Sequence, residues 1–484
     1  MQEALKLLSD LGDDDIRWIL DTGHEEEVAA DTVLITEGTD PDNLYILLSG
    51  VVDIRVSGIG ATPLAKLGPG ELLGEMSFLD GAPASANVVA GEPSLVLALP
   101  RQALQARLGG DAAFSARFYK ALALLTSRRL RDSMGTFGRW LRPPIEGGDE
   151  GKSELWSTLS GALDRFKELL HTAAGQESTA ADQDPPADVA RHAREEFSRL
   201  LVALNESVGD GAAAAREWRE EMGLRLQREC LPFVLLSRFA ERCYRKPRGY
   251  AGDYLTIEWM YRNTPGGHGA IGRLIDGAIL DAPPCRAVRN RRGLLTQEML
   301  DAIERKGSAP LHVVSMACGP AEELFDVLAR LDDCGRLQAT LIDIDREALG
   351  HVADRIEREQ LGEQVTLEHA NLVYLATGQQ QLGLANQDLV YSIGLIDYFE
   401  DRYVVALLNY AYEVLAEGGK VILGNFHPRN AAKAFMDYVL DWKLIHRTEE
   451  DMNRLYEMSR FGRPCTRIQY EAEGINLFAE CEKV

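Results

Sequence analysis

The chain has 484 residues, which is enough for roughly three domains of about 150 residues each. Hydrophobic residues make up 45% of the chain, so a sizeable core is expected, and 52 basic against 75 acidic residues give a net charge of −23. This negative field argues against nucleic acid as a general partner.

The cysteines and the apolar runs indicate a compartment. The seven cysteines are scattered and lack C-x-x-C spacing, which argues against a disulfide framework or a metal site and favours the cytoplasm. No apolar run reaches about 18 residues, and "MQEALKLLSDLGDDD" has no signal-peptide pattern. We therefore expect no membrane span.

Short β-type runs separated by Gly, Pro and Asp follow a helical start. They extend from about residue 32 to about 100 and include "TVLITEG", "NLYILLSGVVDIRVSG" and "ANVVAGEPSLVLALP". This spacing predicts an antiparallel barrel or sandwich. Residues 101–140 return to a helical pattern, in which Phe114, Phe118 and Leu122 share an apolar stripe.

The composition then changes abruptly. "TAAGQESTAADQDPPAD" contains no Lys or Arg and cannot bury a core, which predicts a flexible linker. Strands alternate with helices beyond about residue 310, which predicts a doubly wound, mostly parallel sheet. We expect a multidomain chain with four parts: an N-terminal antiparallel β-barrel with flanking helices at 1–140, a helical segment and flexible linker at 141–190, a helical cap or substrate region at 191–305, and a Rossmann-like α/β domain at 306–484.

Residues 1–140 resemble the cyclic-nucleotide-binding domain family through "LITEGTDPDNLYILLSGVVDIRV" and "LGPGELLGEMSFLDGAPASANVVA". In that family a Gly-Glu pair, here Gly74-Glu75, binds the ribose hydroxyl, and an Arg a few residues later neutralises the cyclic phosphate. Ala84 stands at the Arg position, and no Lys or Arg occurs from Gly68 to Pro100. Because a buried phosphate without a cation is costly, we expect that this domain does not bind cAMP in the usual way.

Two further roles of this region stay open. The domain serves assembly, with Glu75 capping a short helix, or it senses an unidentified effector. The helix expected over 112–138 lies where the family places its dimerising helix, so its apolar stripe is either a homodimer interface or internal core.

"LHVVSMACGPAEELFDVL" has the pattern of a strand, a tight turn and a helix. Small residues in such a turn let the backbone approach a bound molecule. The stretch resembles the first motif of class I S-adenosylmethionine-dependent methyltransferases, although two of the usual glycines are alanines and Ser315 replaces the usual acidic residue. The resemblance implies S-adenosyl-L-methionine as the cofactor and, as cofactor-binding residues of this motif, Ser315, Ala317, Gly319 and Ala321.

Later segments are in register with the same family. "ATLIDIDREAL" places Asp343, followed by Ile344, at the end of the second strand, where a carboxylate can hold both ribose hydroxyls. Asn371 and Leu372 end the third strand and suit the adenine edge, and Ser392 ends the fourth strand. In open α/β sheets, ligands bind at these carboxyl ends.

Two structural alternatives compete with this interpretation. Asp343 and Asp345 could serve only as helix caps. An NAD-binding domain would have a similar alternation of strands and helices, but "ACGPAEEL" lacks the G-x-G-x-x-G spacing of that fold.

The loop "CYRKPRGYAGDYLTIEWMY" combines helix-breaking residues with four tyrosines, a combination suited to covering a bound molecule. "KPRGYAGDY" together with "MACGPAEEL" and "YSIGLIDYFED" resembles a narrower family, the methyltransferases of extracellular factor 3-hydroxypalmitic acid methyl ester biosynthesis. This resemblance covers residues 190–484. It implies methyl transfer to the carboxylate of a 3-hydroxy fatty acid, which gives a methyl ester that serves as a cell-density (quorum-sensing) signal.

Several residues are candidates for this chemistry. We expect the catalytic residues to be Tyr250, Asp397, Tyr398 and His427. We expect the acceptor to be bound by Arg248, Tyr254, Tyr261 and Asn425.

Each candidate also has a structural alternative. His427 would act as a base only for a hydroxyl or amine acceptor, and otherwise is a loop hydrogen-bonding residue. Arg248 could form a surface salt bridge instead of binding an acidic headgroup, and Asp253 is expected to be an N-cap. Trp259 and Met260 are expected in the core.

Three functions are compatible with these patterns. The first is a methyltransferase of a small acidic molecule. The second is a methyltransferase of another small-molecule or protein acceptor that is gated by an effector at the N-terminal barrel. The third is a non-catalytic scaffold that senses the cofactor.

Overall fold

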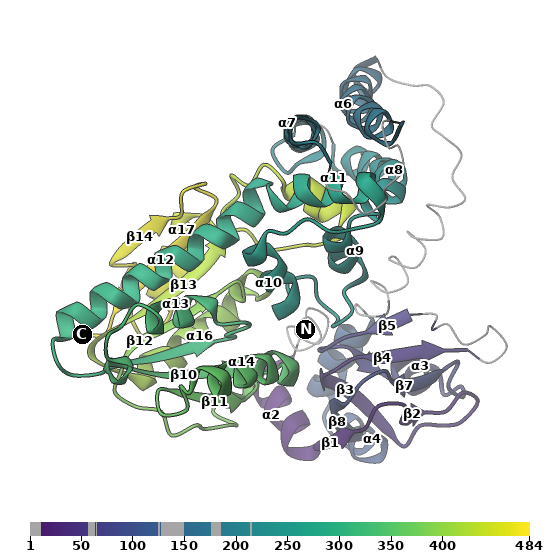
Figure 1. The fold of residues 1–484 in the computed structure, drawn as a ribbon. Coiled ribbons are helices and arrows are strands. Elements are labelled where there is room, and N and C mark those ends of the chain that lie inside the picture. Colours follow the sequence, from purple (N-terminus) through teal and green to yellow (C-terminus); the bar gives the residue numbers. More distant parts are fainter. Residues whose placement is uncertain are drawn as a thin grey trace. The chain divides into compact units, whose positions relative to one another are not determined.

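The computed structural model describes residues 11–56, 63, 65–123, 126, 150–175, 185–212 and 215–484. Contacts divide the chain into two compact units, both drawn in Figure 1. The first comprises Met1–Pro143 with Lys246–Tyr250, and the second comprises Pro144–Arg245 with Ala251–Val484. In the described part of the chain, no helix combines the length and apolarity needed to cross a bilayer.

The first unit contains two four-stranded antiparallel sheets, with strand orders β1-β8-β3-β6 and β2-β7-β4-β5. The strands are β1 (His24–Val28), β2 (Val33–Ile35), β3 (Asn43–Ser49), β4 (Val52–Arg55), β5 (Ala65–Leu67), β6 (Leu72–Leu73), β7 (Asn87–Ala90) and β8 (Ser94–Pro100). Their alternating apolar side chains meet between the sheets, where Leu47 and Val96 of one sheet join Val52 and Val88 of the other. The predicted antiparallel β domain is therefore confirmed.

Helices flank these sheets, namely α2 (Asp13–Thr22), α3 (Glu75–Asp80), α4 (Arg101–Gly110) and a helix over 112–123. In the last of these, Phe114 and Phe118 are buried, and their rings contact Trp18 and Phe78 of the same unit. The described half of the expected dimerisation helix thus supplies internal core. Residues 127–138 lie outside the described residues, and a homodimer stays a prediction.

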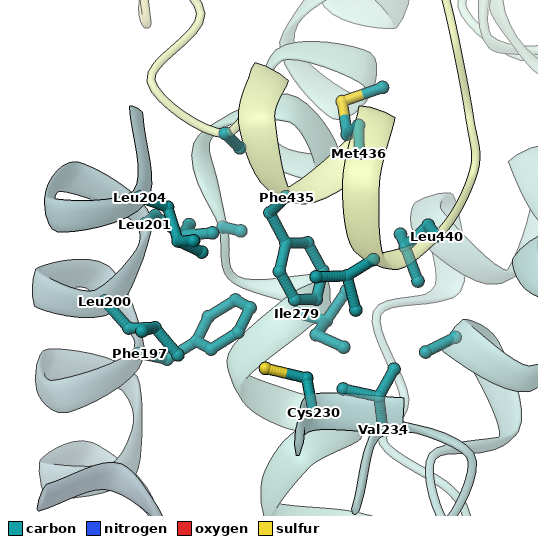
Figure 2. Packing of buried hydrophobic residues seen from close by; sticks show 14 of the residues in the cluster. Phe197, Leu200, Leu201, Leu204, Cys230, Val234, Ile279, Phe435, Met436 and Leu440 are labelled. Carbon is teal, nitrogen blue, oxygen red and sulfur yellow. The ribbon is translucent and has the colours of Figure 1, made fainter. Parts of the chain in front are cut away.

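The second unit begins with a helical region. Its helices are α6 (Glu150–Gly175), α7 (Ala187–Val208), α8 (Arg216–Val234), α9 (Arg238–Arg245), α10 (Tyr254–Arg262), α11 (Gly269–Leu280) and α12 (Pro283–Lys306). The core between them includes Phe197 and Leu204 of α7, Cys230 of α8 and Ile279 of α11 (Figure 2).

A segment from the far end of the chain completes this helical core. A short helix, η3 (Phe435–Val439), follows the fifth strand of the sheet and places the Phe435 ring 5.2 Å from that of Phe197 (Figure 2). Met436 and Leu440 are buried in the same cluster. The helical region therefore shares one core with the sheet domain that follows it.

The sheet of the second unit has seven strands in the order β11-β10-β9-β12-β13-β15-β14. The strands are β9 (Leu311–Met316), β10 (Leu337–Asp343), β11 (Val365–His369), β12 (Gln387–Ile393), β13 (Leu415–Phe426), β14 (Arg467–Tyr470) and β15 (Asn476–Glu482). The first five are mutually parallel and lie in the predicted runs, which confirms the α/β sheet. β14 and β15 are antiparallel additions that were not expected.

Helices connect the strands and cover the sheet. They are α13 (Glu322–Leu328), η1 (Cys334–Arg336), α14 (Arg346–Glu359), α15 (Leu372–Ala376), η2 (Ile396–Tyr398), α16 (Asp401–Val414) and α17 (Glu449–Met458). One sheet face packs against α12, α13 and α14 through Leu295, Phe325 and Val352. Because the first five strands are parallel, their carboxyl ends lie at the same edge of the sheet.

A network of ion pairs and hydrogen bonds joins α12 to strands β13 and β14. Glu298 accepts from Lys420 of β13 at 2.8 Å and also bonds Arg467 and Gln469 of β14. Burial alone would raise the pKa of Glu298, but hydrogen bonds from Lys420, Gln469 and Arg467 outweigh it and lower the pKa from 4.5 to about 2. The ionised form therefore stabilises the fold above pH 4.5, and this contribution is lost as the pH falls from 4.5 towards 2.

Glu298→Gln is expected to lower the free energy of unfolding at pH 7 by about 1 kcal/mol, a modest value because solvent screens part of the network. The difference in urea midpoint between variant and wild type should be smaller at pH 3 than at pH 7. The control is Glu304→Gln, an exposed position on the same helix. Equal differences at both pH values would contradict the assigned network.

Candidate functional site

The turn after β9 forms the floor of the candidate site. Ala317, Gly319 and Ala321 have φ angles of 58°, 53° and 51°, a left-handed conformation that is uncommon for alanine. The turn is tied to the neighbouring strand because Cys318 N donates to Ile342 O at 3.1 Å. A Cβ placed on Gly319 would meet no atom within 4 Å, so the backbone of this turn is open at Gly319.

Asp343 ends β10 and faces this turn. Its Oδ2 accepts from Gly319 N and its Oδ1 from Asp345 N, both at 2.9 Å. Burial raises the pKa of Asp343 to about 6, against the lowering effect of these two backbone donors. Each carboxylate oxygen can accept more than one hydrogen bond, so Asp343 can still receive the two hydroxyls of a ribose.

Asp345 has a different role. Its Oδ1 accepts from Glu347 N at 2.9 Å and from Ala348 N at 3.3 Å, which caps α14. The helix-cap alternative thus holds for Asp345, whereas Asp343 binds the turn. The carbonyl oxygen of Ile344 lies within hydrogen-bond distance, 3.1 Å, of His369 Nε2 at the end of β11.

The end of β11 is occupied by another helix cap. Asn371 Oδ1 accepts from Val373 N at 2.9 Å and caps α15, while the backbone N–H of Asn371 donates to Gln380 Oε1. Leu372 is buried. The capping bond uses one lone pair of the Asn371 side chain, so contact with an adenine edge stays a prediction.

Two predicted serines lie inside the sheet. Ser392 is buried and its Oγ donates to Met316 O at 2.8 Å, which joins β12 to β9. Ser315 is also buried, opposite Tyr391 in the β9–β12 ladder. Both are positioned to hold strands together directly beneath the site, and direct cofactor contact by either is still a prediction.

Asp397 and Tyr398 follow β12 at the carboxyl end of the strand. Asp397 Oδ1 accepts from Phe426 N at 2.7 Å, and burial raises the pKa of Asp397 to about 6. Tyr398 Oη accepts from Trp442 Nε1 at 2.8 Å, and burial raises the pKa of this phenol. A Cβ placed on Gly252 would lie 2.7 Å from Tyr398 Oη, so the end of the glycine-rich loop passes close to this hydroxyl.

Asn425 lies at the end of β13 and His427 directly follows it, and both side chains are engaged by protein partners. The Asn425 amide donates to Ile445 O at 2.9 Å, and its Oδ1 accepts from Arg447 Nη1 at 2.9 Å. His427 Nδ1 accepts from Arg429 N at 3.1 Å, so the proton resides on Nε2, which lies 3.2 Å from Glu449 Oε2. With both ring nitrogens engaged, His427 fits its alternative as a hydrogen-bonding loop residue, and a base role stays a prediction.

The predicted tyrosines are only partly brought together. Tyr254 starts α10, and its ring lies 5.5 Å from that of His351 on α14. Tyr261 is near the end of α10, and burial raises its pKa to about 12 while neighbouring Arg291 opposes the rise. Lys246–Tyr250 group with the first unit, so Tyr250 and Arg248 are not among the residues that the second unit gathers at the strand ends.

The remaining residues of this loop and of α10 lie where the sequence predicted. Asp253 caps α10 by accepting from Thr256 N at 2.8 Å, as expected, and also pairs with Arg242. Met260 is buried, and Trp259 packs partly buried against the same core.

Two buried arginines were missed. Arg291 of α12 is 4% exposed, and Arg447 is 2% exposed. Their signal in the sequence is weak, because "RAVRNRRGLL" looks like a charged helix face and "HRTEED" looks like an exposed loop. Only burial distinguishes these two side chains from the other arginines nearby.

Comparison with known protein families agrees with the two units. Residues 25–109 match the family model described as "Cyclic nucleotide-binding domain", and residues 248–474 match the one described as "Putative methyltransferase". The second match includes most of the KPRGYAGDY loop along with strands β9 to β14 of the sheet.

Individual relatives match about a third of the chain or less. The chain is similar to the cAMP-dependent protein kinase regulatory subunit of Emericella nidulans, with 29% identity over 34% of this chain and 44% of that protein. It is also similar to the cyclic AMP receptor protein of Thermus thermophilus, with 43% identity over 36% of this chain and 75% of that protein. For the regulatory subunit of Emericella nidulans and the next two relatives, by contrast, the chain spans less than half of the relative's length.

The chain is also similar to a solved structure. Magnesium protoporphyrin IX methyltransferase from Synechocystis, crystallised with bound SAH, has 15% identity and a TM-score of 0.33. The alignment covers 42% of this chain and 87% of that one.

Proposed function

Because the chain carries a cyclic nucleotide-binding domain and a methyltransferase domain, we propose that it transfers a methyl group from S-adenosyl-L-methionine to the carboxylate of a small acidic molecule. The resemblance of the KPRGYAGDY and YSIGLIDYFED segments to the 3-hydroxypalmitic acid methyl ester family supports a 3-hydroxy fatty acid as the acceptor, and the product would be its methyl ester.

One observation carries the cofactor part of the proposal. Asp343 stands at the carboxyl end of β10, and Gly319 N of the small-residue turn donates to it. A ribose bound by Asp343 would place the rest of the nucleoside over the open backbone at Gly319. The methionine arm would then extend towards the end of β12, which pairs directly with β9.

The reaction requires little acid–base chemistry from the protein. A carboxylate acceptor is already ionised at pH 7. When bound, the cofactor would supply an activated methyl group: the carboxylate oxygen would form the new bond to carbon, and the electron pair of the broken carbon–sulfur bond would neutralise the sulfonium, so no proton would be transferred. The protein must align oxygen, carbon and sulfur and exclude water. Both ring nitrogens of His427 are held by protein hydrogen bonds, which suits a reaction that needs no general base.

The direct test uses S-adenosylmethionine labelled in the methyl group. We expect the full chain to convert 3-hydroxypalmitate into a solvent-extractable product that releases labelled methanol in alkali, as a methyl ester does. A matched reaction with 1,3-hexadecanediol, which lacks the carboxylate, should give no label. Label in protein or RNA, or equal labelling of the diol, would contradict the proposed acceptor.

For the N-terminal domain we propose a regulatory or assembly role without ordinary cAMP binding. Ala84 is 8% exposed in the core between the two sheets, and its N–H and carbonyl bond Thr39 and Gly38. Position 84 therefore offers no cation to a cyclic phosphate.

A second candidate is effector gating, which the family match at residues 25–109 favours. The labelled reaction repeated with and without cAMP or cGMP distinguishes the two. An unchanged rate supports the first proposal, and a changed rate supports gating. Binding of S-adenosylhomocysteine without turnover of any acceptor would support the non-catalytic scaffold instead.

A further inference from the structure

Arg291 of α12 is a buried cation whose donors are only partly engaged by the protein. It is 4% exposed, and its Nε is buried without a hydrogen-bond partner. Within residues 215–484 as described, no carboxylate forms an ion pair with it. Since an unpaired buried charge costs several kcal/mol, a structural role alone does not explain this side chain.

Arg291 lies at the carboxyl ends of the strands, where the candidate site is. A Cβ placed on Gly394, directly after β12, would lie 3.0 Å from Arg291 Nη1 and 3.3 Å from Nη2. The absence of a side chain at Gly394 therefore lets the guanidinium reach the carboxyl end of the central strand. Tyr261 is hydrogen-bonded to Arg291, and the carboxyls of Glu323 and Asp397 interact with it electrostatically.

The neighbouring acids are occupied elsewhere. Glu323 Oε1 accepts from Tyr391 Oη at 2.9 Å, and Asp397 Oδ1 accepts from Phe426 N at 2.7 Å. Burial raises the pKa of both carboxyls, which weakens them as counter-ions.

The other buried arginine of this unit shows the contrast. Arg447 donates to the carbonyls of Ile396 and Phe399, to Asn425 Oδ1 and to Asp401 Oδ1. The protein satisfies the donors of Arg447, whereas Arg291 is hydrogen-bonded to the Tyr261 side chain and its Nε has no hydrogen-bond partner.

We infer that Arg291 binds a carboxylate at the methionine end of the candidate site. This inference rests on the proposed function and names a further residue of the same site. A planar guanidinium offers parallel N–H groups that match a carboxylate. The cofactor's own α-carboxylate is the expected source, because Arg291 adjoins residues that follow both β9 and β12, and the carboxylate of the acceptor is the other source.

The test compares two nucleosides that differ in that carboxylate. Calorimetric titration gives the Kd of S-adenosylhomocysteine and of 5′-methylthioadenosine, which lacks the amino acid arm. Arg291→Met is expected to weaken S-adenosylhomocysteine binding at least about tenfold and to leave 5′-methylthioadenosine binding unchanged. Arg291→Lys, which keeps the charge without the fork, should lie between.

Arg292→Met is the matched control. Arg292 is the next residue on α12, but it pairs with Asp326 at 2.6 Å and with Glu322 at 3.0 Å. We expect its removal to leave both Kd values unchanged. The unliganded Arg291→Met protein should keep or raise its Tm, because the variant removes an unpaired buried charge, and a purely structural arginine would give a lower Tm.

The remaining outcomes separate the two sources and the two proposals. If S-adenosylhomocysteine binding is unaffected, 3-hydroxypalmitate is titrated into protein saturated with S-adenosylhomocysteine, and an affinity loss in Arg291→Met assigns the residue to the acceptor. If neither titration changes, the inference is wrong. If wild-type protein does not bind S-adenosylhomocysteine at all, the proposed function itself fails.

Discussion

Asp343→Ala is expected to raise the Kd of S-adenosyl-L-methionine and of S-adenosylhomocysteine at least about tenfold. Hydrogen bonds to a charged acceptor contribute about 1.5–3 kcal/mol each, and about 1.4 kcal/mol corresponds to a factor of ten. The substitution also removes the acceptor for Gly319 N, which holds the turn against β10. Calorimetric titration of the full chain measures the effect.

Asp345→Ala is the matched control for this variant. Asp345 lies two residues away and accepts from Glu347 N and Ala348 N as the cap of α14. Its loss should cost about 1 kcal/mol of stability and leave the Kd near the wild-type value. If Asp343→Ala binds as wild type does, or if both variants lose affinity equally, Asp343 is not the ribose ligand.

The same carboxylate predicts a pH dependence of opposite sign for stability and for binding. Burial raises the pKa of Asp343 from 3.8 to about 6, so the folded protein keeps a proton there that the unfolded chain has released. The contribution to stability therefore falls as the pH rises from 3.8 to 6. Ribose hydroxyls donate to the ionised form, so the Kd should increase as the pH falls below about 6. Titrations at pH 5 and pH 7.5 measure this change, and a Kd that is independent of pH would contradict it.

Arg447→Met is expected to lower the free energy of unfolding by about 3–5 kcal/mol. The guanidinium is 2% exposed and donates to two carbonyls of the segment that carries Asp397 and to Asn425. Methionine fills similar volume but leaves these buried acceptors unsatisfied. Urea unfolding followed by intrinsic fluorescence gives the change in midpoint.

Arg454→Met tests whether burial is the reason. Arg454 also pairs with Asp401, at 2.8 Å, but its side chain is 51% exposed. Exposed ion pairs contribute about 0–1 kcal/mol, so this variant should unfold near the wild-type midpoint. A larger loss in Arg454→Met than in Arg447→Met would exclude the buried network as the stabilising element.

The candidate site was predictable where local pattern and strand position coincide. The turn at Ala317–Ala321 and the carboxylate of Asp343 belong to neighbouring strand ends, so sequence order already placed them together. Asn425 and His427 were also placed at a strand end, yet their hydrogen bonds lead to Arg447 and Glu449, which are about twenty residues further along the chain. Partners at such separations leave no periodic signal.

The sequence alone determined the domain order, the five parallel strands and the strand-end positions of Asp343 and Asp397, because alternation of apolar residues and turn chemistry are local properties. Only the tertiary structure decided that η3 completes the helical core, that β14 and β15 extend the sheet, and that the buried Arg291 is only partly engaged by the protein while Arg447 is saturated. An arginine has the same letter in either setting. Burial and the identity of its partners arise when distant segments pack, and those two quantities set its electrostatic free energy.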